Sequence, residues 1–275
     1  MPTALSRARL IRIVQSRQNA RVKELRAAFT RNIRTPGGLL AIEGEHLIRE
    51  AISSGLRLAT IFVQTGSEAL LNPLPIPEDV EILAVPPDVF ASAVHTESPQ
   101  GIAALVQPRD FTLEQVLAGE PPLLLIVAGL QDPGNLGTLI RSAEAFGATG
   151  YVILPGTVSV DNQKTLRASS GSIFRLSGIT VCEDHLFHAL SQRKIRTIAA
   201  VPPKGQPSVR QDFTQACALI LGNEGSGIPP EILRRADTQV NIPTPGPVES
   251  LNAAIAGSIL FYEAARQRAP ERSQP

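Results

Sequence analysis

Hydrophobic positions in the first part of the chain recur at the spacing of an α-helix. Asn19 can cap such a helix, and the turn at residues 35–38 ends it. The apolar positions that share one face of this helix are Val22, Leu25, Phe29 and Ile33. A second amphipathic helix is predicted at about residues 45–54 and stops at Gly55. Each helix has an apolar face that must pack against another element.

Strand-like and helical patterns alternate up to about residue 107. Apolar runs typical of strands lie at residues 59–63, 81–85 and 101–106, and a helical pattern at residues 88–94 separates the last two. Such alternation describes a small α/β sandwich of roughly one hundred residues. We therefore expect an N-terminal domain that spans residues 1–107.

The second half is more apolar and follows a polar, proline-bearing connector at about residues 107–122. Residues 123–129 form a continuous apolar run, which is typical of a central parallel strand covered on both faces. Further strands are predicted at 151–154, 197–200 and 218–221, alternating with helices at 136–146, 163–168 and 185–193, before an alanine-rich amphipathic helix at 251–268. This pattern predicts a doubly wound parallel sheet in a domain spanning residues 120–270, with ligands beyond the carboxyl ends of the strands.

Charge is distributed unevenly, although the formal net charge of the 275 residues is only +1. Residues 1–34 carry nine basic side chains and one acid, Glu24. Clustered positive charge supplies sequence-independent affinity for a phosphate backbone. The basic residues that we expect to contact a nucleic acid are Arg17, Arg21, Lys23 and Arg26. A solvated basic arm without a partner would show the same composition.

Cysteine and histidine positions give no indication of a metal site. Cys182 and Cys217 lie far apart, and we expect two reduced, buried thiols in a cytoplasmic protein. The four histidines have no zinc-binding spacing, and His185 and His188 fall on a predicted surface helix. We expect neither a metal nor a disulfide.

No apolar run reaches the length of a membrane span, since the longest, at residues 123–130, suits a buried strand. The N-terminus lacks the apolar core of a secretory signal. It is arginine-rich like a mitochondrial transit peptide, but its basic residues continue into a regular helix. We therefore interpret it as part of the folded protein.

Three segments of the second half follow predicted strands and contain polar side chains. The first, residues 132–147, reads DPGNLGTLIRSAEAFG. Gly134 and Gly137 permit a tight turn from strand to helix, and Arg141 could grip a phosphate through two parallel hydrogen bonds. Asn135 and Arg141 reach the same end of the sheet only if Asn135 precedes the helix proper. Helix capping by Asn135 and a surface arginine would explain the segment without any chemistry.

The second segment, residues 219–230, reads LILGNEGSGIPP. Its glycines let the backbone approach a ligand closely. Glu224 suits a positively charged ligand or an amino group better than a phosphate, because a carboxylate and a phosphate repel each other. A plain glycine-rich turn is the alternative.

The third segment, residues 240–256, reads VNIPTPGPVESLNAAIA. Its prolines stiffen the loop. Ser250 or Asn252 could cap the long final helix, and capping alone would account for both.

Together, in this order and at these separations, the three segments closely resemble the three motifs of the SpoU (TrmH) family of the SPOUT methyltransferases. The first half resembles that family's substrate-binding domain, a fold akin to kink-turn-binding ribosomal proteins. That second resemblance rests on residues 16–19 (SRQN), 43–46 (EGEH) and 98–101 (SPQG). One position departs from the family pattern, since Thr244 stands where methionine is common.

The resemblance implies an α/β fold in which a parallel-sheet SPOUT domain carries a deep trefoil knot, an exception to the rule against threaded chains. It implies a bent S-adenosyl-L-methionine held largely by backbone groups, and a homodimer with Arg141 near the subunit boundary. The positions that correspond to the cofactor pocket are Leu221, Gly222, Ile242, Pro243 and Leu251.

The resemblance also implies the reaction, transfer of a methyl group to a ribose 2′-hydroxyl of ribosomal or transfer RNA. The catalytic positions that it implies are Asn135, Arg141, Glu224, Ser250 and Asn252. A free guanidinium is essentially never deprotonated in a protein, so Arg141 suits a phosphate grip and alkoxide stabiliser better than a simple base.

Two rival functions are weighed against this hypothesis. A nucleotide-dependent oxidoreductase would carry a G-x-G-x-x-G turn and a following acidic residue, and the chain lacks both. A non-catalytic RNA-binding ribosome-assembly factor would suit the basic arm, but would give Glu224, Ser250 and Asn252 no reason to keep their pattern. Within the family, housekeeping and drug-resistance roles both fit, and no motif encodes the target nucleotide.

Overall fold

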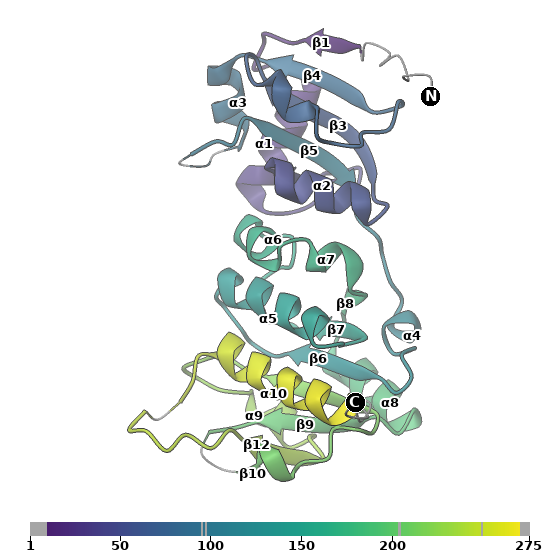
Figure 1. Cartoon of the computed structure of the whole chain (residues 1–275), viewed down its shortest axis with the longest axis vertical. Coiled ribbons are helices and arrows are strands. Elements are labelled where there is room, and N and C mark those ends of the chain that lie inside the picture. Colours follow the sequence, from purple (N-terminus) through teal and green to yellow (C-terminus); the bar gives the residue numbers. More distant parts are fainter. Residues whose placement is uncertain (1–9, 95, 97, 203–204, 249, 270–275) are drawn as a thin grey trace, which may run out of the picture. The chain divides into compact units, whose positions relative to one another are not determined.

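The computed structural model describes residues 10–94, 96, 98–202, 205–248 and 250–269. The chain divides into two compact units, Met1–Arg109 and Asp110–Pro275, which are described separately below (Figure 1).

The first unit is built on a five-stranded mixed sheet with the strand order β1-β4-β3-β5-β2. Its strands are β1 (Ile11–Ile13), β2 (Leu40–Glu43), β3 (Arg57–Gln64), β4 (Glu81–Val85) and β5 (Ile102–Gln107). Strands β1, β4 and β3 are parallel, whereas β5 runs antiparallel to both β3 and β2. The predicted α/β character is confirmed, and β1 and β2 are two strands that the sequence patterns did not indicate.

Helices α1 (Ala20–Arg31), α2 (Glu45–Ser53) and α3 (Pro87–Val94) pack on this sheet, and η1 (Glu68–Leu71) is a short 3-10 turn. Helices α1 and α3 share a core with strand residues such as Phe62. Asn19 caps α1 as predicted, with its side chain accepting from the Arg21 backbone N–H at 2.9 Å. The prediction that Ile33 belongs to the apolar face was wrong: α1 ends at a left-handed Asn32, and Ile33 is 50% exposed.

The second unit contains a seven-stranded sheet, and every strand pair in it is parallel, as predicted. The strand order is β10-β12-β9-β11-β6-β7-β8. Its strands are β6 (Leu123–Val127), β7 (Gly150–Ile153), β8 (Gly178–Thr180), β9 (Arg196–Ala200), β10 (Gln206–Pro207), β11 (Cys217–Leu221) and β12 (Thr238–Asn241). Strands β6 and β11 are adjacent and entirely buried, which explains their continuous apolar sequences.

Helices cover both faces of this sheet (Figure 1). The helical segments are α4 (Leu113–Val116), α5 (Pro133–Ala145), α6 (Gln163–Ser169), α7 (Ser172–Arg175), α8 (Glu183–Gln192), η2 (Ser208–Arg210), α9 (Pro230–Leu233) and α10 (Ala253–Arg268). One face packs against α5 and α10, with Leu139 and Phe261 in its core. The other packs against α4, α8 and α9, with Leu186 and Ile232 in its core.

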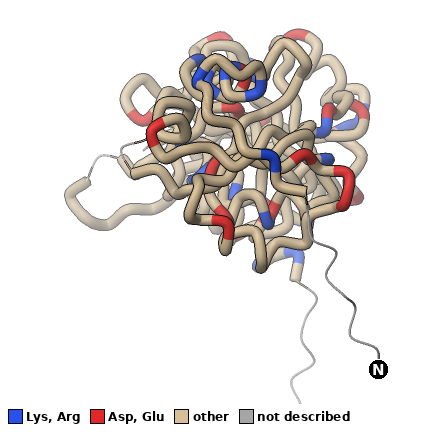
Figure 2. Tube along the Cα trace, turned by 90° about the horizontal axis from the view of Figure 1, so that it is seen from above, with Lys and Arg blue, Asp and Glu red and all other residues tan. Residues whose placement is uncertain are grey.

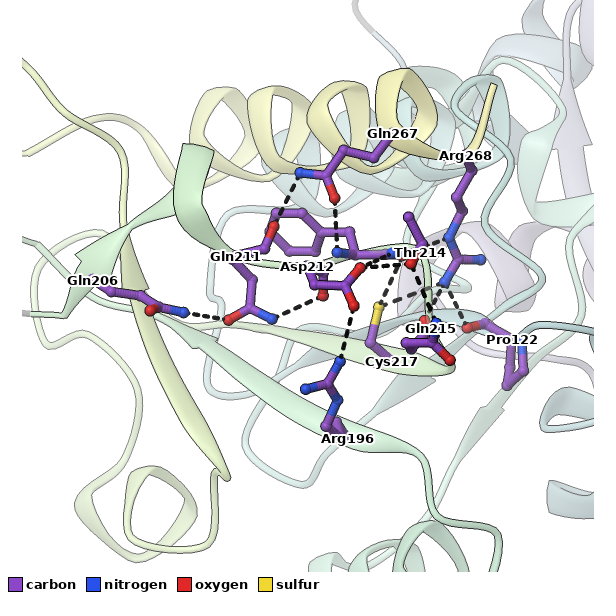
Figure 3. A network of polar contacts seen from close by, with 11 residues as sticks. Pro122, Arg196, Gln206, Gln211, Asp212, Thr214, Gln215, Cys217, Gln267 and Arg268 are labelled. Carbon is purple, nitrogen blue, oxygen red and sulfur yellow. Dashed lines mark hydrogen bonds and ion pairs between the residues drawn. The ribbon is translucent and has the colours of Figure 1, made fainter. Parts of the chain in front are cut away.

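The carboxyl end of α10 is fastened to the segments that precede β6 and β11 (Figure 3). The Arg268 guanidinium donates to four backbone carbonyls, and its neighbour Gln267 accepts from the Phe213 N–H at 2.9 Å. These carbonyls belong to Phe213 (2.7 Å), Pro121 (2.9 Å), Pro122 (3.1 Å) and Gln215 (2.6 Å). One charged side chain thus bonds to several backbone carbonyls at once, and these bonds fix the position of the end of α10.

Two sequence-based expectations about burial were wrong. Helix α10 is not simply amphipathic, because Ile255, Ile259 and Tyr262 are 53%, 38% and 56% exposed on the side away from its core face. Cys182 is exposed, whereas Cys217 is buried as expected; both are free thiols. His185 and His188 are exposed on α8, in agreement with the prediction.

Among the described helices, none has both the length and the apolar character that crossing a membrane requires.

Candidate active site

The three polar segments follow β6, β11 and β12, at the carboxyl edge of the parallel sheet. Parallel strands end on the same edge, so the loops after them can meet there. One direct link joins the first two loops: the Asn223 side-chain amide donates to the Gly129 carbonyl at 3.4 Å. This edge therefore contains the candidate site.

Helix α5 begins earlier than predicted. Asp132 is its N-cap and accepts from the Asn135 backbone N–H at 2.7 Å, while Pro133 occupies the first turn. Asn135 thus lies inside the first turn rather than before the helix, and its side chain is not the cap. An Asp-Pro pair at the start of a helical pattern could have indicated this.

Gly137 also differs from its predicted role in a turn, because it lies within α5. A Cβ atom there would be 2.4 Å from the Thr165 carbonyl oxygen and 2.7 Å from the Ala168 Cβ. Only a residue without a side chain lets α5 and α6 approach this closely. Gly137 therefore sets the packing of the two helices that flank the site.

Asn135 and Glu224 are brought together, although they lie 89 positions apart in the chain. The Asn135 Nδ2 donates a hydrogen bond to the Glu224 Oε1. Asn135 is half-buried and Glu224 is exposed. The contact fixes the orientation of the amide and engages one of the two carboxylate oxygens of Glu224.

The glycine-rich loop after β11 is folded tightly back on itself. Asn223 Oδ1 accepts from the backbone N–H groups of Gly225 and Ser226 at 2.9 and 3.1 Å, and the Asn223 and Gly227 backbones bond to each other. A Cβ at Gly222 would lie 2.4 Å from the Gly227 carbonyl group. Asn223, which the sequence analysis did not select, therefore holds the turn that presents Glu224, since an asparagine side chain commonly bonds to the backbone two residues further on.

Asn252 is the cap of α10, which decides between the two candidates that the sequence offered. Its Oδ1 accepts from the backbone N–H groups of Ala254 and Ile255 at 2.9 and 3.2 Å. The oxygen is therefore occupied, and the side-chain Nδ2 is the group that can face a ligand. Ser250 is exposed before this cap, and Glu249 lies outside the described residues.

Of the predicted cofactor positions, Leu221 and Gly222 lie at the end of β11, Ile242 and Pro243 follow β12, and Leu251 precedes the cap of α10. Leu221 is buried, Gly222, Ile242 and Leu251 are half-buried, and Pro243 is exposed. Ile242 packs against the main core cluster. Apolar side chains beside close-approaching glycine backbone suit an adenine ring and its edge hydrogen bonds, so these residues fit S-adenosylmethionine.

Arg141 is exposed near the middle of α5. In the described part of the chain, no side chain pairs with it, and it does not contact the Asn135–Glu224 pair. Two nearby residues contact α10 instead. The Ser142 hydroxyl accepts from the Ser258 hydroxyl at 2.7 Å, and the ring centroids of Phe146 and Tyr262 lie 5.7 Å apart.

Three of the four predicted RNA-binding residues form contacts within the first unit. Arg17 pairs with Asp88 at 2.7 Å, and Arg21 pairs with Glu24 at 3.0 Å. The Arg26 Nε donates to the Ser92 carbonyl at 3.0 Å. Lys23 is exposed. Arg7 and Arg9 of the basic arm lie outside the described residues.

The ion pairs of Arg17 and Arg21 offset part of the positive charge of residues 1–34. The hydrogen bond from Arg17 lowers the pKa of the Asp88 carboxyl below its ordinary value. Basic and acidic positions are interspersed along the traced chain (Figure 2). Arg17 and Arg21 therefore have acidic partners, whereas Arg26 bonds only to neutral groups. As for metals, the described residues contain no group of three histidine, cysteine or acidic side chains placed to hold an ion.

Comparison with known proteins identifies both halves of the chain. Residues 122–262 match the SpoU rRNA Methylase family, and residues 19–104 match the MRM3-like substrate binding domain. A 23S rRNA (guanosine(2553)-2′-O)-methyltransferase of Bacillus subtilis is 33% identical over 90% of this chain and 97% of its own. A 23S rRNA (uridine(2479)-2′-O)-methyltransferase of Streptomyces viridochromogenes is 30% identical over 93% of both chains.

Solved structures agree with these relatives. The SpoU methyltransferase AviRb from Streptomyces viridochromogenes, in complex with AdoMet, has a TM-score of 0.80 at 28% identity, covering 91% of this chain and 98% of its own. An AdoMet-bound rRNA methyltransferase from Sinorhizobium meliloti has a TM-score of 0.81 at 26% identity, covering 94% and 99%. The chain therefore belongs to the SpoU methylase family.

Proposed function

We propose that this protein is an S-adenosylmethionine-dependent RNA methyltransferase that modifies a ribose 2′-hydroxyl, with ribosomal RNA as the substrate class. The observation that carries the proposal is the Asn135–Glu224 contact, which joins two predicted catalytic positions across 89 residues. The relatives named above support the reaction. Both are 2′-O-methyltransferases of 23S rRNA, and the similarity to this chain covers nearly their whole length.

S-adenosylmethionine would be held by the backbone near Leu221 and Gly222, at the end of β11, and by the apolar side chains of Ile242 and Leu251, which lie between β12 and α10. Pro243 stiffens the wall of this pocket. When bound, S-adenosylmethionine supplies an electrophilic methyl group. The main task of the protein is then to align the acceptor oxygen with that group.

Polar groups of the site act on the acceptor. Asn135 and Glu224 orient the ribose, with the second carboxylate oxygen of Glu224, the one that Asn135 does not engage, accepting from a substrate hydroxyl. Asn252 contributes its Nδ2, and Ser250 its hydroxyl. Arg141 grips the phosphate next to the target nucleotide and stabilises the oxyanion that develops as the 2′-hydroxyl loses its proton. Recognition of the 2′-hydroxyl also selects RNA over DNA.

The active form in this proposal is a homodimer. Ile255, Ile259 and Tyr262 form an exposed apolar stripe on α10, and contiguous exposed apolar surface is typical of an interface. Arg141 lies exposed on α5, which packs beside α10. An isologous dimer through this face would place Arg141 at the subunit boundary.

Three finer features of the fold are also proposed from the family resemblance. The first is a trefoil knot in the second unit. The second is a kink-turn-binding type of fold for the first unit. The third is the domain limits, residues 1–107 and 120–270, which the division at Arg109 supports.

RNA recognition is assigned to the first unit, where Arg17, Arg21, Lys23 and Arg26 lie on or beside α1. Lys23 is the exposed member of this set. Arg17 and Arg21 act where an RNA phosphate competes with Asp88 and Glu24. Methylation of ribosomal RNA and two free thiols are consistent with a place in the cytoplasm.

Calorimetric titration of the purified protein with S-adenosylmethionine separates this function from that of a non-catalytic RNA-binding factor. We expect saturable binding with one site per chain. Retained RNA binding without any affinity for the cofactor would instead favour the assembly-factor alternative.

A further inference from the structure

Lys164, at the start of α6, lies across the first turn of α5. Its Nζ pairs with the Asp132 Oδ2 at 2.8 Å, while the Asp132 Oδ1 accepts from the Asn135 backbone N–H at 2.7 Å. Asn135 in turn donates to Glu224. We propose that Lys164 and Asp132 are positioning residues for methyl transfer, which act by fixing the Asn135–Glu224 pair. This inference rests on the function proposed above.

The position of Lys164 is fixed from its own side. Asn162 caps α6 and accepts from the Lys164 backbone N–H at 2.8 Å. The close packing of α5 on α6 at Gly137 holds the two helix starts at a constant separation. The lysine side chain therefore spans between two rigid elements rather than reaching from a loop.

Gly134 keeps the path of this side chain open. A Cβ atom at Gly134 would lie 2.9 Å from the Asp132 Oδ1 and 3.0 Å from the Lys164 Cε. Both distances are shorter than ordinary van der Waals contact, so any side chain at this position would push the lysine aside. Gly134 therefore leaves the space that the Lys164–Asp132 ion pair needs.

The pair matters for orientation and local charge rather than for stability. The side chains of Lys164 and Asp132 are 57% and 41% exposed, and exposed ion pairs stabilise a fold only slightly. Lys164 also neutralises a carboxylate that would otherwise repel an approaching RNA phosphate. The pKa of Asp132 is lowered chiefly by the Lys164 hydrogen bond, so the carboxylate stays ionised at neutral pH.

The test compares three variants with the wild-type protein. Lys164→Met removes the cation, and Asp132→Asn removes the ion pair but keeps a side-chain oxygen able to cap α5. Arg167→Met is the matched control, because Arg167 is another exposed cation on α6, one turn further on. Methyl transfer is measured with an unmodified 23S rRNA transcript, cofactor affinity by calorimetry, and the geometry of the site by crystallography.

We expect Lys164→Met and Asp132→Asn to lower kcat roughly ten- to a hundredfold, the scale of a small misalignment of reacting groups, with Kd for the cofactor unchanged. Lys164→Arg should restore most of the loss. Crystals of Lys164→Met should show Asn135 turned away from Glu224, and Arg167→Met should keep the wild-type kcat.

Two results would overturn the inference. One is a rise in KM for RNA with unchanged kcat, which would make Lys164 a phosphate contact instead. The other is an intact Asn135–Glu224 contact in the Lys164→Met crystals. Failure of the wild-type protein to methylate any RNA would instead count against the proposed function. The crystals would still test whether Lys164 fixes the Asn135–Glu224 contact.

Discussion

The side-chain amide of Asn135, in the first turn of α5, donates a hydrogen bond to the carboxylate of Glu224 in the loop after β11. The contact bridges two strand-end loops and gives each partner a fixed orientation. An amide that is fixed in the free protein needs no reorganisation when the substrate binds, and such preorganisation is a main source of catalysis.

Removing this contact should slow methyl transfer without unfolding the protein. We expect Asn135→Ala to lower kcat on the order of a hundredfold, the scale seen when one preorganised hydrogen-bond donor is lost. Glu224→Gln keeps an oxygen that can accept from Asn135 but removes the charge, so it separates orientation from electrostatics. Single-turnover assays measure both. Wild-type rates in Asn135→Ala would remove the pair from the mechanism.

Arg141→Ala should abolish methyl transfer while the affinity for S-adenosylmethionine stays nearly unchanged, because Arg141 is exposed on α5 and is not one of the proposed cofactor-binding residues. Arg141→Lys should recover little activity, since lysine cannot form two parallel hydrogen bonds to a phosphate. Calorimetry and methyl-transfer assays on the same preparations provide the measurement. Parallel loss of both properties would contradict the role assigned to this residue.

Ile259→Asp should convert a dimer to a monomer, because it places a charge in the middle of the exposed stripe on α10. Sedimentation equilibrium gives the oligomeric state directly. Val209→Asp is a suitable control, since Val209 is a similarly exposed apolar residue outside that stripe. A monomeric wild-type protein would contradict the proposed dimer, and a dimeric Ile259→Asp variant would show that the interface lies elsewhere.

The two thiols should react very differently. Cys182 is exposed and should be modified rapidly by a thiol reagent at about pH 8, whereas Cys217 is buried, and burial raises the pKa of its thiol. The stabilising contribution of the neutral Cys217 is complete below the pKa of the unfolded chain and is lost as pH rises through the folded value. Urea unfolding at neutral pH and at about pH 10 should therefore show a larger loss for the wild type than for Cys217→Ala. Equal losses would contradict the raised pKa.

The buried part of the fold could be predicted from the sequence, because burial on both faces leaves a continuous apolar run. Strands β6 and β11 are such cases. The short edge strands β1, β8 and β10 span two or three partly exposed residues each. Such short segments cannot show the alternation of apolar and polar residues by which a strand is recognised.

The candidate site was predictable in its residues but not in its contacts. The motifs identified Asn135 and Glu224, yet only the fold could show that they touch, or that Asp132 rather than Asn135 caps α5. Ion pairing of Arg17 depends on Asp88, a residue distant in the sequence. Ile255 is exposed and Leu260 is buried, but both are large apolar residues, so the sequence alone did not separate the exposed stripe of α10 from its core face.

The central claim is tested most directly by incubating the protein with S-adenosylmethionine labelled on its methyl group and total RNA from a host that lacks this gene. Digestion to nucleosides then locates the label. We predict that it appears in a 2′-O-methylated nucleoside from ribosomal RNA and disappears in Arg141→Ala. Label on a base, or no transfer to any RNA including ribosome-assembly intermediates, would contradict the account.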